Sequence, residues 1–219
     1  GIIGATGCGK TTLVQLLLRF YDADSGMIRI DGDDVRSVPL DILRRKFGIV
    51  FQNDFILADS IRENISFGRN IDDDEVAKSI KNAQAKDFIN GLEDGVSHRL
   101  AARGTNVSGG QRQRILISRA LADEPEILIL DDSSSALDYK TDASLRRAVR
   151  KSYADTTTVI VAQRISSISH ADLILVMDKG KIVGRGTHEQ LLKTCDEYRI
   201  IADSQMGDHA IEGGSTNEE

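Results

Sequence analysis

The chain has 219 residues and a mass of 24.0 kDa, and its 40% of hydrophobic residues can supply the core of one substantial domain. With 28 Lys and Arg against 34 Asp and Glu, a formal net charge of -6, no Trp and 5% aromatic residues, the composition excludes a global basic field or a base-stacking surface for nucleic acid. The two cysteines, Cys8 and Cys195, are too few for a disulfide framework and indicate a reducing compartment. No apolar run approaches the roughly 18 to 20 residues that cross a bilayer.

The beginning of the chain predicts a strand, a loop and a helix. The letters "GII" (1–3) are typical of the end of a buried strand, residues 4–10 of a loop, and "TTLVQLLLRF" (11–20) of a helix with apolar residues at helical spacing. Next, "GMIRIDGDDV" alternates apolar and polar residues around the turn dipeptide Asp31-Gly32. This alternation predicts short antiparallel strands.

The middle of the chain changes from strand to helix periodicity. After a predicted strand in "FGIVFQ" (47–52), residues 54–106 carry helix-period apolar residues with Asp or Ser at the expected helix starts. The α/β pattern then returns as helices and single strands, at 110–123, 126–132, 139–153, 157–163 and 173–183. We therefore predict an α/β core of 1–53 and 115–206, a helical subdomain of 54–114, and a disordered polar tail of 207–219.

The loop "GATGCGKT" fits the pattern G-x-x-x-x-G-K-[ST], which predicts a phosphate-binding loop. Its residues, with the Thr that follows, are Gly4, Ala5, Thr6, Gly7, Cys8, Gly9, Lys10, Thr11 and Thr12. The glycines allow backbone amides to surround phosphate oxygens, the helix start adds partial positive charge, Lys10 reaches the outer phosphates and the Thr11 hydroxyl ligates Mg²⁺. An accidental Gly-rich turn is the alternative, but the predicted strand before the loop and helix after it argue against that.

The stretch "ILILDDSSSALD" (127–138) places a carboxylate at the end of an apolar strand. There Asp131 is expected to face the Mg²⁺ ion held by Thr11, through a water, because Mg²⁺ dehydrates reluctantly. Alone this pattern would be weak, since many strands end in Asp as a turn residue. In this order after a phosphate loop it is a strong indication of a nucleotide site.

The stretch "VSGGQRQR" (107–114) identifies a family. Alone it would indicate a helix start capped by Ser108. Together with "GATGCGKTT", "VFQND", "ILILDD", "SALD" and "VAQR" in this order, it resembles the nucleotide-binding domain of ATP-binding cassette (ABC) proteins, over residues 1–201. The segments "LLRFYDADSGMIRIDG", "LRRKFGIVFQNDFILADSIRENISFG" and "GRGTHEQLL" resemble the exporter type, which works with a six-helix transmembrane domain.

The resemblance implies an α/β fold, with a P-loop NTPase (RecA-like) core, a small antiparallel β part and an inserted helical subdomain. It implies the cofactors ATP and Mg²⁺, a position at the cytoplasmic face of a membrane, and a second cassette paired head to tail, so that each ATP lies between one phosphate loop and the other chain's signature. By the same resemblance, Gln52 senses Mg²⁺ and the γ-phosphate, and Asp131 is the Mg²⁺ carboxylate. The signature residues are Ser108, Gly109, Gly110 and Gln111, and Asp138 belongs to the interface loop.

Two catalytic positions depart from the family's active pattern. Asp132 stands where the pattern has a Glu base, and it is about 1 Å shorter, an error that can cost on the order of 10²-fold in rate. Gln163 stands where the pattern has a His at the γ-phosphate, and it cannot become a cation. We therefore expect a degenerate site on this chain and an intact signature that serves a partner's site, similar to the less active half of heterodimeric bacterial exporters.

Some alternatives stay open. A non-transport ABC ATPase of DNA repair, chromosome structure or translation would bring coiled coils or a basic patch, which the sequence lacks, so no nucleic-acid partner is expected. A regulatory module without turnover in any assembly would differ only in its partner chain. Because a phosphate loop normally follows a complete strand with others beside it, we expect the chain to be a piece of a longer protein that lacks the N-terminal strands.

Overall fold

The structure is a computed structural model that describes residues 1–133 and 136–212, with side chains up to Gln205. Two compact units make up the chain. The first consists of Gly1–Leu17 and the chain from Ile160 onward, and the second of Leu18–Val159. The domain boundaries expected from the sequence differ from this division and stay a prediction. Helix α6 (Gly109–Leu121) continues through the expected boundary at 114.

The first unit is built on a parallel arrangement of buried strands. Its elements are β1 (Ile2–Gly4), α1 (Lys10–Leu17), the end of β6 (Thr157–Val161), α8 (Ile165–Ile168), β7 (Ile174–Asp178), β8 (Lys181–Gly186), α9 (His188–Thr194) and α10 (Asp196–Glu212). Strand β1 lies between β6 and β7 and pairs in parallel with both, in the register Ile2↔Val161 and Ile3↔Val176. All three residues of β1 are buried, as expected for a central strand of a parallel sheet.

The segment 173–183, predicted as a single strand, is two antiparallel strands. Strands β7 and β8 pair across Lys179 and Gly180, whose φ angles are 46° and 78°. Left-handed conformations at both central residues define the tight turn that matches strand twist, so the chain reverses there. The prediction was wrong because Lys is an uncommon residue for a left-handed position.

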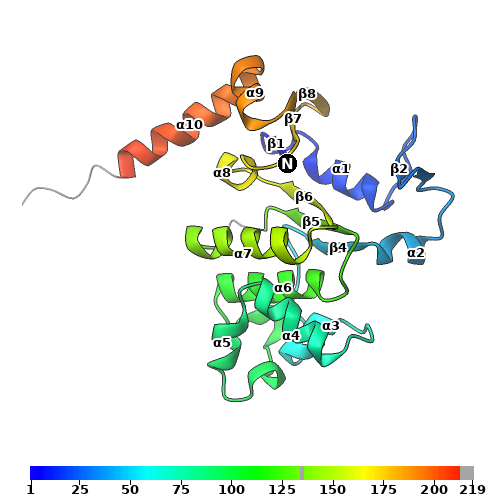
Figure 1. Cartoon of the computed structure of the whole chain (residues 1–219), viewed down its shortest axis with the longest axis vertical. Coiled ribbons are helices and arrows are strands. Elements are labelled where there is room, and N and C mark those ends of the chain that lie inside the picture. The colour runs from blue at the N-terminus through cyan, green and yellow to red at the C-terminus, as the bar shows by residue number, and fades with distance from the viewer. Residues whose placement is uncertain (134–135, 213–219) are drawn as a thin grey trace, which may run out of the picture. The chain divides into compact units, whose positions relative to one another are not determined.

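Helices α9 and α10 were not predicted, and they complete the core of the first unit. Figure 1 shows α10 following α9 at the end of the chain. The buried cluster of the first unit consists of Ile3, Ala162, Ile165, Ile168, Ile174, Val176, Leu191, Cys195, Tyr198 and Ala202. Helix α10 continues to Glu212, so residues 207–212 are helical where the sequence predicts a disordered tail, while 213–219 lie outside the described residues. A single glycine, Gly207, costs a helix only about 1 kcal/mol, and no proline follows it.

Tyr198 gives this core a dependence on pH. Its side chain is 0% exposed and its hydroxyl lies 2.8 Å from Nδ1 of His188, and burial raises the pKa of Tyr198 to about 12. In the unfolded chain the Tyr198 phenol has the ordinary tyrosine pKa of about 10. The folded protein therefore holds the phenol proton more tightly, and this contribution to stability is present below about pH 10 and lost as the pH rises toward 12.

We expect Tyr198→Phe to make stability less sensitive to alkaline pH. Thermal unfolding midpoints measured from pH 9 to 11.5 should fall less steeply for Tyr198→Phe than for the unmodified chain. The exposed Tyr139→Phe serves as the control and should keep the original slope. Parallel curves for all three proteins would contradict the assignment.

The second unit contains the antiparallel β part, the helical region and two further parallel strands. Its elements are β2 (Arg29–Ile30), β3 (Asp33–Asp34), α2 (Leu40–Arg45), β4 (Phe47–Val50), α3 (Ile61–Ser66), α4 (Asp73–Asn82), α5 (Lys86–Asn90), the 3-10 turns η1 (Gly95–Ser97) and η2 (Ala102–Gly104), α6, β5 (Ile127–Asp131), α7 (Tyr139–Ser152) and the start of β6. Strands β2 and β3 pair antiparallel around Asp31-Gly32, as predicted. Strands β4 and β5 pair in parallel, with Val50 opposite Leu130.

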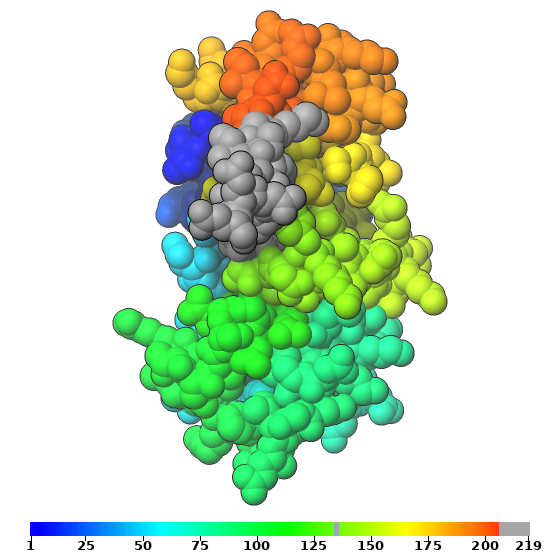
Figure 2. Space-filling model, turned by 90° about the vertical axis from the view of Figure 1, so that its left-hand side faces the viewer, coloured from blue at the N-terminus to red at the C-terminus, as the bar shows by residue number. Residues whose placement is uncertain are grey.

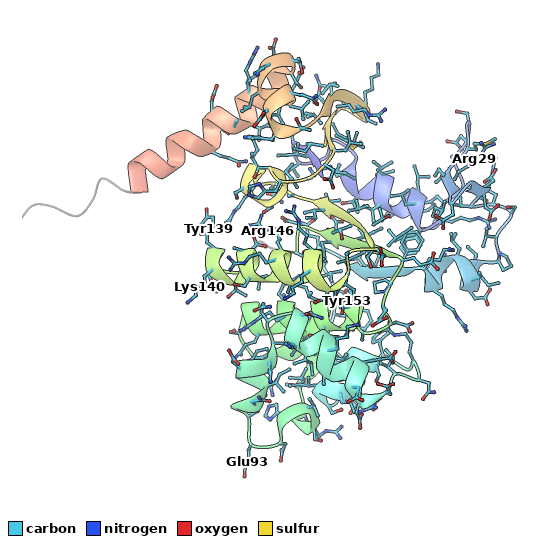
Figure 3. All side chains as sticks on the ribbon, in the orientation of Figure 1. Arg29, Glu93, Tyr139, Lys140, Arg146 and Tyr153 are labelled. Atoms are coloured by element: carbon cyan, nitrogen blue, oxygen red, sulfur yellow. The ribbon has the colours of Figure 1, made fainter. Side chains whose placement is uncertain are left out.

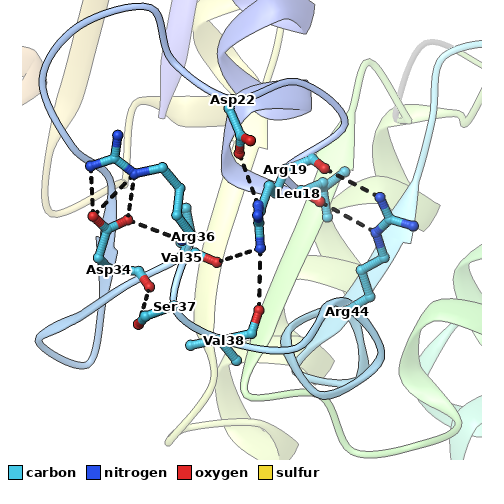
Figure 4. A network of polar contacts seen from close by, with 9 residues as sticks. All are labelled: Leu18, Arg19, Asp22, Asp34, Val35, Arg36, Ser37, Val38 and Arg44. Atoms are coloured by element: carbon cyan, nitrogen blue, oxygen red, sulfur yellow. Dashed lines mark hydrogen bonds and ion pairs between the residues drawn. The ribbon is translucent and has the colours of Figure 1, made fainter.

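Arginine side chains hold the segment that carries β2, β3 and α2. Arg19 donates to the carbonyl oxygens of Val35 and Val38 at 3.2 and 3.3 Å, and Arg44 donates to the carbonyl oxygens of Leu18 and Arg19 at 3.4 and 3.2 Å (Figure 4). The predicted helix 11–20 ends at Leu17, and Arg19 then adopts a left-handed φ of 51°. This conformation turns the Arg19 backbone out of the helix.

The helical region packs around α6. Figure 1 shows α3, α4 and α5 grouped about this helix, and the cyan and green residues form one continuous mass in Figure 2. As the sequence predicts, two of these helices begin at Ser or Asp, with Ser60 capping α3 and a capping box at Asp72 and Glu75 on α4, whereas α5 begins after Ala85 without a side-chain cap. Helix α7 has Tyr139 and Lys140 at its beginning and Tyr153 just beyond its end (Figure 3). Among the described residues, no helix has the length and apolar character needed to cross a membrane.

Candidate functional site

The predicted phosphate-binding loop, residues 4–10, joins β1 to α1 in the first unit. Lys10 folds back over it, and its Nζ donates to the carbonyl oxygens of Gly4 at 2.7 Å and Ala5 at 3.0 Å. The Nζ atom also lies 3.8 Å from Sγ of Cys8. The ammonium group is thereby held at the loop beside the start of α1, where backbone amides attract anions.

Backbone contacts fix the shape of the loop. Cys8 donates its N–H to Ala5 O at 3.2 Å, and its own carbonyl accepts from the N–H of Gly180 at 2.9 Å. A Cβ atom on Gly4 would lie 2.1 Å from Met177 O, so only glycine fits there. Gly9 has a φ of 104°, a conformation that other residues rarely adopt.

The outer side of the loop is accessible. Residues Ala5, Thr6 and Gly7 are exposed, and so are Thr11 and Thr12 in the first turn of α1. Gly4 and Cys8, in contrast, are buried against the strands. An anionic ligand can therefore approach the loop amides, Lys10 and the Thr11 hydroxyl from solvent.

Gln163 lies in the same unit as the phosphate loop, on the exposed loop that follows β6. Ile2 and Val161 are paired on neighbouring parallel strands, so Gly4, at the end of β1, and Gln163, in the loop after β6, each lie two residues beyond this pair. The carboxyl ends of parallel strands meet at one edge of a sheet, which is where α/β proteins bind ligands. The backbone of Gln163 is held by Gln205 of α10, whose Nε2 donates to Gln163 O at 2.7 Å.

In the second unit, the carboxyl ends of β4 and β5 bring Gln52 and Asp132 together. Each lies two residues beyond the pair Val50 and Leu130, and Nε2 of Gln52 donates to Oδ2 of Asp132 at 3.4 Å. Asp131 ends β5 and is 2% exposed, whereas Asp132 is half-buried and has a left-handed φ of 50°. The register therefore places the predicted sensor and the predicted base side by side.

A buried ion pair that the sequence analysis missed anchors the chain just after Gln52. Arg119 of α6 lies 3.3 Å from Oδ1 of Asp54, with 9% and 10% of the two side chains exposed. Its guanidinium also donates to the backbone O of Asn64 at 2.7 Å, and it stacks on the ring of Phe67 at 4.3 Å. An arginine on the apolar face of a predicted helix was the signal that could have revealed this pair, because such a charge is almost always paired when buried.

The predicted signature forms the beginning of α6. Ser108 is the N-cap: its Oγ accepts from the N–H of Gln111 at 3.2 Å, and Oε1 of Gln111 accepts from the N–H of Ser108 at 2.8 Å. Gly109 is exposed, and a Cβ atom on Gly110 would lie 3.2 Å from Ala136 O. The capping box uses the Ser108 oxygen as an acceptor, so the hydroxyl proton can be donated to an anion.

Asp138 caps α7 and was predicted to belong to an interface loop. Its carboxylate accepts from the N–H and from the hydroxyl of Thr141, at 2.9 and 2.7 Å, and these bonds lower the pKa of Asp138. The exposed carboxylate is therefore oriented and ionised at neutral pH. Residues 134 and 135 of "DDSSSALD" lie outside the described residues.

Each unit thus gathers part of the predicted site. The first holds the phosphate loop and Gln163, and the second holds Gln52, Asp131, Asp132 and the signature. We predict that Thr11 and Asp131 share one Mg²⁺ ion, and this stays a prediction. The roles of the other site residues stay predictions as well.

Comparison with known proteins identifies the family. The ABC transporter family profile matches residues 1–135. The ABC transporter ATP-binding protein YknU of Bacillus subtilis, described as uncharacterized, is 46% identical over 95% of this chain and 36% of its own length. The ATP-dependent lipid A-core flippase of Xanthomonas oryzae pv. oryzae is 42% identical over 87% of this chain and 33% of its own. The chain spans about a third of these relatives.

A solved structure agrees in fold as well as in sequence. The structure of a bacterial Atm1-family ABC exporter with ATP bound superposes with a TM-score of 0.90 and is 38% identical, covering 93% of this chain and 36% of that one. The α/β fold with a mostly parallel sheet is that of a P-loop NTPase, as predicted from the sequence. The chain belongs to the ABC transporter family, of which it carries the ATP-binding domain.

Proposed function

We propose that the chain is the ATP-binding domain of an exporter, which binds Mg–ATP, pairs with a second cassette and drives transport through a transmembrane domain from the cytoplasmic face of a membrane. The observation that carries this proposal is the phosphate loop between β1 and α1, with Lys10 held at its rim in a chain of the ABC transporter family. Relatives named as export ATP-binding/permease proteins support the direction of transport.

The residues present suit ATP and Mg²⁺. The loop amides and Lys10 provide positive charge for the phosphates, and Thr11, Asp131 and Gln52 provide the hard oxygen ligands that Mg²⁺ prefers. When bound, Mg²⁺ neutralises charge on the β- and γ-phosphates. Gln163 lies beyond β6 at the strand edge shared with the phosphate loop, where its amide can donate to a γ-phosphate oxygen.

We further propose that this chain's own site is degenerate. Asp132 is one methylene shorter than the Glu of the active pattern, and its carboxylate accepts from Gln52. A base misplaced by about 1 Å can cost about 10²-fold in rate. Gln163 cannot supply the positive charge of a protonated His to the developing phosphate charge.

The intact signature suggests that this chain contributes to the ATP site of its partner. Ser108 caps the beginning of α6, and Ser108 and Gly109 are exposed there, which suits the γ-phosphate of an ATP held by another chain. A homodimer would have two poor sites. We therefore propose a heterodimer in which this signature completes the partner's competent site.

The test compares steady-state ATP hydrolysis by the intact assembly carrying Lys10→Ala or Ser108→Ala in this chain alone. We expect Ser108→Ala to lower turnover about tenfold or more, the worth of one charge-assisted hydrogen bond, and Lys10→Ala to leave most of it. The reverse order would place the working site on this chain's own phosphate loop and contradict the degenerate assignment. No turnover in any form of the assembly would favour a purely regulatory module.

A further inference from the structure

The C-terminal helix α10 reaches the loop that carries Gln163 through one side chain, Gln205. Its Oε1 accepts from the N–H of Ile165 at 2.9 Å, and its Nε2 donates to the O of Gln163 at 2.7 Å. A single amide group thereby bridges the two peptide groups on either side of Arg164. Gln205 lies 42 positions after Gln163, so the bridge is a tertiary contact.

Helix α10 is firmly placed where it makes this contact. Tyr198 and Ala202 of the helix are 0% and 3% exposed and belong to the buried cluster of the first unit. The same cluster contains Ala162 and Ile165, which flank Gln163, and Ile3, which precedes the phosphate loop. Gln205 lies one turn beyond Ala202, so its amide approaches the loop from a part of the helix that the buried cluster holds in place.

We propose that Gln205 is a positioning residue that sets the location of Gln163, so that α10 forms part of the γ-phosphate sensor of this chain. The inference rests on the proposed function, in which the Gln163 side chain contacts the γ-phosphate. Side chains on loops place ligand-binding atoms only as accurately as their backbone is held. In the stretch Gln163–Ile165, that backbone is held at both ends by the Gln205 amide.

The chemistry of the bridge predicts which substitutions break it. Gln205→Leu removes the donor and the acceptor at similar size. Gln205→Glu keeps an acceptor for the Ile165 N–H but turns a second oxygen toward the carbonyl oxygen of Gln163, which repels it. Ser204→Glu is the matched control, because it adds the same carboxylate at the adjacent exposed position, where the native hydroxyl donates to Ile201 O within the helix.

The experiment uses the intact exporter assembly with variants in this chain only and has two measurements. The first is hydrogen exchange at the Ile165 amide, which we expect to accelerate about tenfold or more in Gln205→Leu but not in Gln205→Glu or Ser204→Glu. The second is the ratio of ATP to ADP affinity at this chain's site, read with fluorescent nucleotide analogues. We expect this ratio to fall about three- to tenfold in Gln205→Leu and Gln205→Glu.

A double-variant cycle separates positioning from general weakening of the fold. If Gln205 acts through the Gln163 side chain, Gln205→Leu should have no further effect on the affinity ratio in a Gln163→Ala background, whereas a merely structural role would add its effect. Unchanged exchange at Ile165, or an additive effect, would overturn the proposal. So would an unchanged ratio in Gln205→Leu when Gln163→Ala lowers it. If Gln163→Ala itself leaves the ratio unchanged, the γ-phosphate role of Gln163 fails first and the positioning role falls with it.

Discussion

Replacing Asp132 by Glu is expected to raise ATP hydrolysis at this chain's own site by about 10²-fold, because the added methylene moves the carboxylate about 1 Å toward the attacking water. The measurement is made in the Ser108→Ala background, in which the partner's site has lost its signature serine and its hydrolysis is lowered. A gain of about 10²-fold at this chain's own site should then stand out above the remaining hydrolysis at the partner's site.

Three controls make the Asp132→Glu result specific. Lys10→Ala added to the same background should abolish the gain, since this lysine belongs to the phosphate loop being tested. Asp132→Asn should give no gain, because an amide is not a base. Gln163→His combined with Asp132→Glu should raise turnover further by restoring a possible cation at the γ-phosphate. If Asp132→Glu leaves the rate unchanged, the side-chain length at residue 132 does not limit ATP hydrolysis at this site.

A small loss of stability should accompany the gain in rate. Asp132 has a φ of 50°, a left-handed conformation that Asp tolerates better than longer side chains because its carboxyl group can bond locally. The same substitution also changes the carboxylate that accepts from Gln52 at 3.4 Å. A lower unfolding midpoint together with faster hydrolysis would be the usual exchange of stability for activity at a catalytic position.

Local sequence patterns predicted the structural features that are local in the chain. The loop between β1 and α1, the turn at Asp31-Gly32 and the Ser108 cap each depend on residues within a few positions of one another. In each case a glycine or a capping side chain favours one backbone conformation, so the local sequence predicts the local structure.

Contacts between residues that are distant in the chain were not predicted. Gln205 bonds to Gln163 across 42 positions and Arg119 to Asp54 across 65. Arg119 lies on the apolar face of a predicted helix, but the sequence does not indicate which residue is its partner. The turn at Lys179 and Gly180 was missed for another reason, because the pairing of β7 with β8 forces Lys into a left-handed conformation. Tertiary packing decides such positions over local preference.

Replacing Arg119 by Leu is expected to destabilise the domain by about 3–5 kcal/mol, because it leaves the carboxylate of a buried ion pair without its cation. Asp54 is 10% exposed in its side chain and would lose its cation, and the backbone O of Asn64 would lose the donor at 2.7 Å. The stacking on Phe67 would be lost as well. Chemical denaturation of the domain measures the free energy of unfolding directly.

Arg112→Leu is the matched control, because this arginine lies exposed on the same helix and its loss should change stability by no more than about 0.5 kcal/mol. The double change Arg119→Leu with Asp54→Leu should recover part of the loss, since it removes the orphaned carboxylate. An effect of Arg119→Leu equal to that of Arg112→Leu would contradict the buried pair.

The pair also connects two parts of the proposed mechanism. Asp54 lies two residues after Gln52, and α6 begins at the Ser108 signature, so Arg119 ties the sensor loop to the signature helix within one unit. Arg119→Lys should keep the charge but lose the forked geometry that reaches Asn64 and Asp54 together. In the Ser108→Ala and Asp132→Glu background, ATP hydrolysis at this chain's own site should therefore fall in Arg119→Lys by a larger factor than the folding equilibrium constant does. The reason is that a loosened Asp54 no longer holds the chain next to Gln52, the proposed sensor of the γ-phosphate.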